Sequence, residues 1–260
     1  MQAIEEFDWK RLPPHFAMIM GSMRRSGKTH LLNWVLYQLR DRFDVAFVFS
    51  STSIVQNSFE YIPKHFHWRG LDESVIERML TQQQACIKRW RVEGQPENSR
   101  PPRVLVVLDD IIADRRLYFS PAITRIFTEG RHSHCSIVLL SQKLVGMTPP
   151  VIRSNADCMV FFRQPSHDYR KHIVKNYLSI NDDRKAPQAF LDAVWDEKFK
   201  ALVILVSESQ HCTELNQFCY HYLAPADDPP PFLLGHEMFH SSARNKIVEK
   251  NVTDRTKAAQ

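Results

Sequence analysis

Nine consecutive residues at 21–29 have the spacing G-x-x-x-x-G-K-[ST] of a phosphate-binding loop. The fixed glycines, Gly21 and Gly27, permit backbone angles that turn successive N–H groups inward around phosphate oxygens. Lys28 can reach the outer phosphates of a nucleotide, and the Thr29 hydroxyl is a ligand for Mg²⁺. The nucleotide-binding residues predicted by this motif are Gly21, Ser22, Met23, Arg24, Arg25, Ser26, Gly27, Lys28 and Thr29.

Two acidic residues, Asp109 and Asp110, follow the most strand-like run of the chain at 104–108. In a nucleotide-hydrolysing site the first acid of such a pair holds Mg²⁺. The second can orient the attacking water as a general base. Gln142 follows another apolar run, at 136–140, and we expect its amide beside the γ-phosphate. An ordinary Asp-containing turn is the alternative, and the phosphate loop upstream argues against it.

These groups require a sheet whose strands end at one edge. Strands are predicted by six apolar runs, at 15–20, 45–49, 104–108, 136–140, 158–162 and 201–206. Helices are predicted by apolar residues at helical spacing over 29–40, 72–90, 121–131, 167–178 and 187–195. This alternation predicts an α/β fold with a mainly parallel central sheet covered by helices on both faces. Ligands of such sheets bind at the carboxyl ends of the strands, where the phosphate loop, Asp109-Asp110 and Gln142 are all expected.

The composition suits one large α/β domain, since 43% of the 260 residues are apolar. We expect a lead-in segment at 1–14, a P-loop domain at 15–223, and a Pro-rich break followed by a mobile basic tail at 224–260. The net charge of +5 fits an anionic partner and fits a solvated basic surface equally well.

The five cysteines are odd in number and scattered, which indicates reduced thiols in an intracellular protein. No apolar run approaches the length of a membrane span, so no membrane partner is expected. The acidic residues 1–10 lack the apolar core of a signal peptide.

The stretch at 128–162 indicates which class of P-loop protein the chain resembles. It contains Gly130-Arg131, a strand that finishes in Gln142, and Arg153-x-Asn155 before a further strand. This arrangement resembles the FtsK/HerA class of DNA-pumping ATPases, which are RecA-like P-loop NTPases. The short chain and the Asp109-Asp110 pair look most like the genome-packaging ATPases of poxviruses and other large double-stranded DNA viruses, with relatives in virophages and mobile elements. The resemblance covers residues 15–206.

The resemblance implies ATP and Mg²⁺ as the cofactors, with Thr29 and Asp109 on the Mg²⁺ side. It implies that Gln142 is the sensor glutamine. Asp110 stands where the class usually has a catalytic Glu, so its role as base departs from the family pattern.

The resemblance also assigns a role to Arg131, which matches an arginine that reaches the nucleotide of a neighbouring subunit in a ring. The extra cation would stabilise the transferring phosphoryl group. A surface arginine at a helix C-terminus, where it favours the helix dipole, is the alternative. For Arg24 and Arg25, phosphate contact and a solvent-facing role both stay open.

The implied function is an ATP-driven double-stranded DNA translocase that packages a viral genome into a capsid. The implied partners are duplex DNA, a homo-oligomeric ring of five or six subunits and a capsid protein. The implied location is the host cytoplasm, the site of virus assembly or the virion. The alternatives are another P-loop enzyme, such as a small-molecule kinase, and a nucleotide-regulated structural protein with little turnover. The chain has no Asn-Lys-x-Asp motif, which argues against a GTPase.

Residues 236–240 also satisfy H-E-x-x-H, the zinc-protease motif. On an α-helix the two histidines would share a face and bind zinc. The motif lies beside the Pro-rich break and no clear third ligand follows, so we do not expect a zinc site. Cys212 and Cys219, near His211 and His221, are interpreted as buried thiols.

Overall fold

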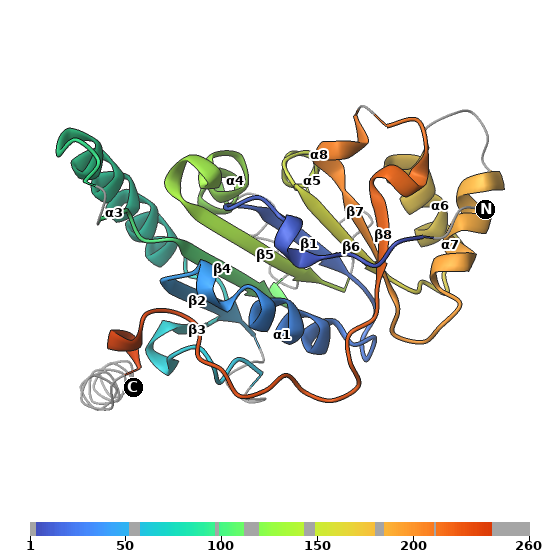
Figure 1. Ribbon diagram of the computed structural model, residues 1–260, viewed down its shortest axis with the longest axis horizontal. Helices are drawn as coiled ribbons and strands as arrows, with labels where there is room; N and C mark the ends of the chain where they lie inside the picture. Colours follow the sequence, from blue (N-terminus) through green and yellow to red (C-terminus); the bar gives the residue numbers. More distant parts are fainter. Residues whose placement is uncertain are drawn as a thin grey trace.

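The computed structural model describes residues 4–51, 58–96, 99–111, 120–142, 149–179, 185–210 and 212–240. These form one eight-stranded sheet in the order β3-β2-β4-β5-β1-β6-β7-β8 (Figure 1). The strands are β1 Ala17–Gly21, β2 Val45–Ser50, β3 His67–Arg69, β4 Val104–Asp109, β5 Cys135–Ser141, β6 Cys158–Phe162, β7 Ala201–Leu205 and β8 Cys219–Tyr222. All pairs from β3 to β6 are parallel, and β7 and β8 pair antiparallel. The predicted mainly parallel sheet is confirmed.

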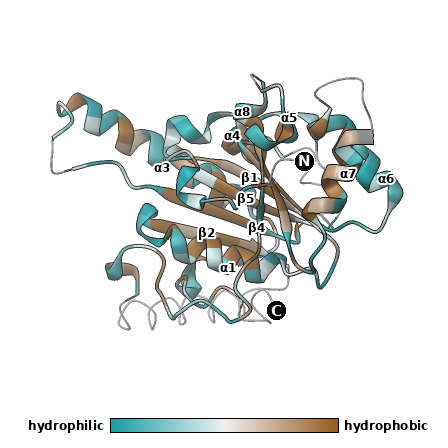
Figure 2. Ribbon diagram, turned by 45° about the vertical axis from the view of Figure 1, so that its right-hand side comes forward, coloured by the Kyte–Doolittle hydropathy of each residue, from teal (hydrophilic) through white to brown (hydrophobic). Residues whose placement is uncertain are grey.

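Two apolar layers enclose this sheet. Every residue of β1, β4, β5, β6 and β7 is buried, as expected for strands covered on both faces. Alternate side chains enter opposite layers, since Ile19 packs in one while Met18 and Met20 pack in the other. Figure 2 shows these central strands in the brown of apolar residues, with teal on the surrounding helices.

Helices supply the cover on each face. One layer is packed by α3 Glu73–Val92, α4 Pro121–Glu129, α5 Pro150–Ser154, α6 His167–Ile173 and α7 Lys185–Val194. The other layer is packed by α1 Lys28–Gln38, and the short α8 Val206–Ser209 follows β7 directly. Asp72 caps α3 by accepting a hydrogen bond from the Val75 N–H, as its position before the helix predicts. Within the described ranges, no helix is long and apolar enough to cross a membrane.

Two strands were not predicted, and several predicted boundaries differ. β3 and β8 are short edge strands, and their histidine and aromatic side chains do not form an apolar run. The helix predicted at 121–131 ends at Glu129 and continues as a 3₁₀ turn, Gly130–Ser133. The strand predicted at 201–206 ends at Leu205, because Val206 begins α8.

The segment after β8, residues 223–240, is packed along α1, and we call it the C-terminal strap (Figure 1). The Trp34 indole donates a 2.9 Å hydrogen bond to the Asp227 carbonyl, and the Phe232 ring stacks on Tyr61 at 4.3 Å. Leu234 is completely buried. The packed part of the chain therefore extends past the break expected at Ala224, because apolar side chains within the Pro-rich segment cover α1. The remainder of the expected tail, 241–260, lies outside the described residues.

The expected lead-in also belongs to the packed domain. Phe7 and Trp9 are buried in the same layer as α1. The Phe7 N–H donates to the His221 carbonyl at 2.8 Å, and the His221 N–H donates to Glu5. The N-terminal segment thus covers the outer edge of β8.

Candidate active site

The phosphate loop joins the end of β1 to the start of α1. Gly27, the residue before the helix, has φ +91°, a left-handed backbone angle that residues with a side chain rarely adopt. Because glycine brings no capping side chain, the N–H groups of the first turn of α1 are available to an anion. The Ser22 N–H donates to the Ser141 carbonyl at 3.0 Å, and Ser26 Oγ donates to Ser22 Oγ at 2.5 Å. These bonds hold the loop against the carboxyl end of β5.

Lys28 lies between this loop and the two acids. Its Nζ donates to the Ser141 carbonyl at 3.5 Å. Burial lowers the pKa of Lys28, while the charges of Asp110 and Asp109 act in the opposite direction. The ammonium group therefore lies between the phosphate loop and the two acids, where it can contact a nucleotide phosphate bound in the loop.

Asp109 is the last residue of β4 and is buried. Ser50, opposite it in register at the end of β2, donates to Asp109 Oδ2 at 3.0 Å. Burial raises the pKa of Asp109, as does the Asp110 charge, whereas Ser50 and Lys28 lower it. A carboxylate fixed in this way is the hard oxygen donor that Mg²⁺ prefers, so the chemistry of Asp109 fits a Mg²⁺ ligand.

A chain of hydrogen bonds links the second acid to the phosphate loop. Gln142 Nε2 donates to Asp110 Oδ1 at 2.6 Å, and Arg24 Nε donates to Gln142 Oε1 at 3.1 Å. Asp110 has φ +52°, a left-handed angle immediately after the strand. The connection is possible because β5, which leads to Gln142, lies between β1 and β4. Arg24 thus contacts Gln142 of its own chain, while Arg25 is exposed.

Arg131 lies at the opposite edge of the sheet. It is exposed in the turn that precedes β5, whereas Gln142 follows the same strand. Seven strand residues at ~3.3 Å each place about 20 Å between them. Gly130 lets this turn approach the strand, since a Cβ there would lie 3.0 Å from the Cys135 carbonyl oxygen. The structure therefore brings together every predicted catalytic residue except Arg131.

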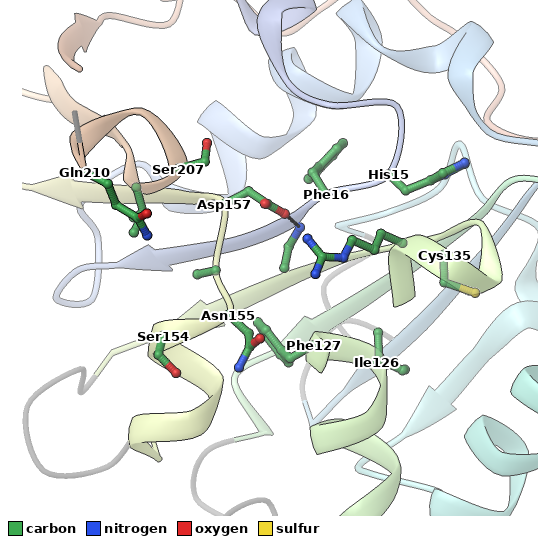
Figure 3. A pocket seen from close by; sticks show the side chains of 14 residues that line it. His15, Phe16, Ile126, Phe127, Cys135, Ser154, Asn155, Asp157, Ser207 and Gln210 are labelled. Carbon is green, nitrogen blue, oxygen red and sulfur yellow. Dashed lines mark hydrogen bonds between the residues drawn. The ribbon is translucent and has the colours of Figure 1, made fainter. Parts of the chain in front are cut away.

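A cavity of about 250 Å³ adjoins Arg131. Its polar lining includes His15, Ser154, Asn155, Asp157, Ser207 and Gln210 (Figure 3). Asp157 accepts a 2.8 Å hydrogen bond from the Ala17 N–H. Burial raises the pKa of Asp157, and the positive charge of Arg131 opposes this. Arg131 thus stands at a polar hollow with a carboxylate near it.

Sequence reasoning missed two groups that interact with Asp109, Ser50 by a hydrogen bond and Tyr61 through charge. Ser50 belongs to a polar strand end, which was a usable signal for a contact with the acid. Tyr61 lies in the irregular stretch after β2, where no periodicity pointed to it. Its hydroxyl donates to Asn33 Oδ1 at 2.9 Å. Burial and then the Asp109 charge raise the pKa of Tyr61 well above its usual value.

The H-E-x-x-H residues do not form an α-helical pair. Glu237–Phe239 is a 3₁₀ turn, in which His236 Nδ1 accepts from the Met238 N–H and His240 Nε2 lies 3.0 Å from the Leu234 carbonyl. Among the described residues, no three His, Cys, Asp or Glu side chains are grouped to hold a metal. Cys219 is buried as expected, Cys212 is only partly buried, and all five cysteines are free thiols.

Comparison with known proteins identifies relatives of the whole domain. Residues 4–228 match the family described as Poxvirus A32 protein. The uncharacterized protein 075L of Invertebrate iridescent virus 6 is 25% identical over 227 residues, 86% of this chain and 83% of that protein. The uncharacterized protein L437 of Acanthamoeba polyphaga mimivirus is 24% identical over 201 residues, 76% of this chain and 70% of that protein.

Two solved structures share the fold. The genome packaging NTPase B204 from Sulfolobus turreted icosahedral virus 2, in complex with AMPPCP, has a TM-score of 0.52 at 13% identity and covers 81% of this chain and 98% of its own. The conjugation coupling protein TcpA of pCW3, with ATPγS, has a TM-score of 0.56 at 15% identity and covers 92% and 65%. The P-loop ATPase fold implied by the resemblance is confirmed.

Proposed function

The chain belongs to the poxvirus A32 protein family and is an ATP hydrolase of viral genome packaging, and we propose that it couples hydrolysis to movement along double-stranded DNA. The observation that carries the proposal is the hydrogen-bonded chain Arg24–Gln142–Asp110. It joins the phosphate loop to the second acid, so loss of the γ-phosphate would affect both the loop and Asp110. B204, which shares the fold, is itself a genome packaging NTPase.

In the proposed hydrolysis, the loop residues 21–29 hold the phosphates of ATP and Lys28 neutralises the outer ones. Thr29 and Asp109 hold Mg²⁺, which supplies further charge neutralisation at the phosphates. Asp110 accepts a proton from the attacking water as general base. Gln142 keeps Asp110 in place through the 2.6 Å hydrogen bond, and it lies beside the space for the γ-phosphate.

Arg131 acts between subunits in this proposal. About 20 Å of β5 separates it from its own Gln142, so its charge cannot serve the phosphate loop of its own chain. In a ring of five or six copies, the amino edge of one sheet would face the carboxyl edge of the next. Arg131 and the polar cavity beside it would then meet the neighbour's γ-phosphate, where an added cation accelerates phosphoryl transfer.

The DNA contact would be made to the phosphate backbone, without reading sequence. The net charge of +5 is consistent with an anionic partner of this kind. We place the activity at the site of virus assembly in the infected cell, in contact with a capsid protein.

An ATPase assay with and without duplex DNA tests the proposal. We expect DNA to stimulate turnover, and the stimulation to fall steeply as salt rises, because phosphate contacts are salt-dependent. Turnover that ignores DNA, together with phosphate transfer to a metabolite, would instead indicate a small-molecule kinase. ATP binding with scarcely any turnover in either condition would indicate a nucleotide-regulated structural protein.

A further inference from the structure

The turn between α7 and β7 brings an aromatic ring to the phosphate loop. β7 runs antiparallel to β6, with Ala201 opposite Phe162, so the turn lies at the carboxyl edge of the sheet. A Cβ built on Gly27 would lie 3.3 Å from Cδ1 of Phe199 and 3.8 Å from Cε1 of Phe162. Phe199 is therefore within contact distance of Gly27, the residue that precedes α1.

Two features of Phe199 are unusual for a residue that only fills space. Its side chain is apolar and large, yet the residue is 47% exposed, whereas Phe162 beside it is buried. Its backbone has φ +70°, which is an outlier for a bulky side chain. Such strained positions cluster at functional sites. Lys198 Nζ lies 4.7 Å from the ring centroid, so a cation borders the ring.

The direction of a bound nucleotide follows from the site. Lys28, Asp110 and Gln142 fix the γ-phosphate on the side of β4 and β5. Because β1 lies between β5 and β6, the opposite end of the nucleotide must extend toward β6 and β7. That is where the exposed ring of Phe199 is placed.

We propose that Phe199 is the platform on which the base of ATP stacks, with Lys198 at its border. The proposal rests on the phosphate loop binding ATP as described above, and it adds the residue that holds the nucleoside. Aromatic side chains bind bases through their π-faces, and removing such a ring weakens binding substantially. We expect Phe199→Ala to weaken ATP binding about tenfold, equivalent to ~1.4 kcal/mol.

Isothermal titration calorimetry with Mg·ATP and with inorganic tripolyphosphate separates the base from the phosphates. Phe199→Ala and Phe199→Leu should both weaken ATP binding about tenfold and leave tripolyphosphate binding within about twofold of wild type. Phe199→Leu keeps an apolar cover over Gly27 without a ring, and Phe199→Tyr keeps the ring and should bind ATP like wild type. Leu233→Ala, another exposed apolar residue, on the C-terminal strap, is the control and should change neither ligand.

Two results would overturn the proposal. If Phe199→Leu binds ATP like wild type, the side chain only covers the loop. If Phe199→Ala loses tripolyphosphate as well as ATP, the ring supports the shape of the loop and does not hold the base. The proposed function fails separately: a wild-type protein that binds ATP through Phe199 but ignores DNA would contradict translocation and leave this inference standing.

Discussion

The two edges of the central sheet differ in how their charged groups are partnered. At the carboxyl edge, Lys28, Asp109 and Asp110 lie within one network of hydrogen bonds and charges that belongs to a single chain. At the amino edge, Arg131 is exposed beside an open polar cavity, and its own phosphate loop is about 20 Å away. The carboxyl edge is assembled by folding, whereas in our proposal the amino edge is completed by a neighbouring subunit.

Arg100, also at the amino edge, differs from Arg131 in that its charge is paired within the chain. Arg100 Nη1 and Nη2 donate to the Asp44 carboxylate at 2.6 and 2.9 Å, and the Arg103 N–H donates to the same carboxylate. This bidentate pair is satisfied within the chain and serves stability. Arg100 and Arg131 therefore form a matched pair: one should affect folding and the other turnover.

The largest effect is expected from Lys28→Ala at the carboxyl edge. Turnover should be abolished and ATP binding should weaken, because the phosphates lose a preorganised cation. Steady-state phosphate release and equilibrium ATP binding measure the two losses. Lys10→Ala, which removes an exposed lysine, is the control and should keep the wild-type rate.

Asp110→Asn should lower turnover by about 10²- to 10⁴-fold while ATP binding stays within about twofold. The amide keeps the shape of the carboxylate and can still accept the Gln142 hydrogen bond, but it cannot take a proton from water. Single-turnover kinetics together with a binding isotherm check this. Wild-type turnover in Asp110→Asn would move the role of base to another residue.

Arg131→Ala should lower turnover by at least ~10-fold and preserve ATP binding. Arg100→Ala, its partner in the comparison, should preserve turnover. Mixing Arg131→Ala with Lys28→Ala should partly restore activity, because some interfaces then combine a sound arginine with a sound phosphate loop. An isolated monomer, verified by light scattering, that hydrolyses ATP at the full rate of the assembly would rule out action between subunits.

Ser50→Ala should shift the pH profile of kcat/KM. Ser50 donates to the Asp109 carboxylate and lowers its pKa, so its loss raises that pKa further. Since Mg²⁺ requires the ionised carboxylate, the acidic limb of the profile should move to higher pH. Ser74→Ala removes a similar bond to the partly exposed Asp72 at the start of α3 and should leave the profile unchanged. If the acidic limb does not move in Ser50→Ala, the ionisation of Asp109 does not set the acidic limb of the kcat/KM profile.

The smallest effect is expected on stability, from Arg100→Ala. The hydrogen bonds and charges of Arg100 and Arg103 hold the pKa of Asp44 at about 2 against the opposing effect of burial, so the ionised carboxylate stabilises the fold above its ordinary pKa. Breaking the pair should cost roughly 1 kcal/mol at pH 7, a value reduced for solvent screening. The difference from wild type in denaturant titrations should vanish as the pH falls toward 2. A difference that persists there would point to packing instead of charge.

Much of the carboxyl edge could be predicted from sequence. Asp109, Asp110 and Gln142 each follow an apolar run, and parallel strands bring such residues to one edge. What a sequence does not contain is strand order, so the contact of Gln142 with both Asp110 and Arg24 emerged only once β5 was found between β1 and β4. The same information separates Arg131 from the phosphate loop.

Other features lacked a local signal. Phe199 lies in a turn, and nothing in its neighbours along the chain indicates that it contacts Gly27. The C-terminal strap was interpreted as a Pro-rich break after the domain because its prolines and acids dominate the composition. Its few apolar residues, such as Phe232 and Leu234, find their partners only in the folded domain.

The C-terminal strap has a mechanical consequence. A load applied at residue 240 first peels Phe239 from Phe66 and then His236 from Asp44. The bonds to α1, at Trp34 and His30, are the last to break, because they hold the end of the strap nearest to β8. Tension from the C-terminal end therefore breaks the contacts of the strap one after another, from residue 240 toward β8. Because Phe232 also packs against Tyr37, the load reaches the helix that begins with Lys28 before the strap has fully detached.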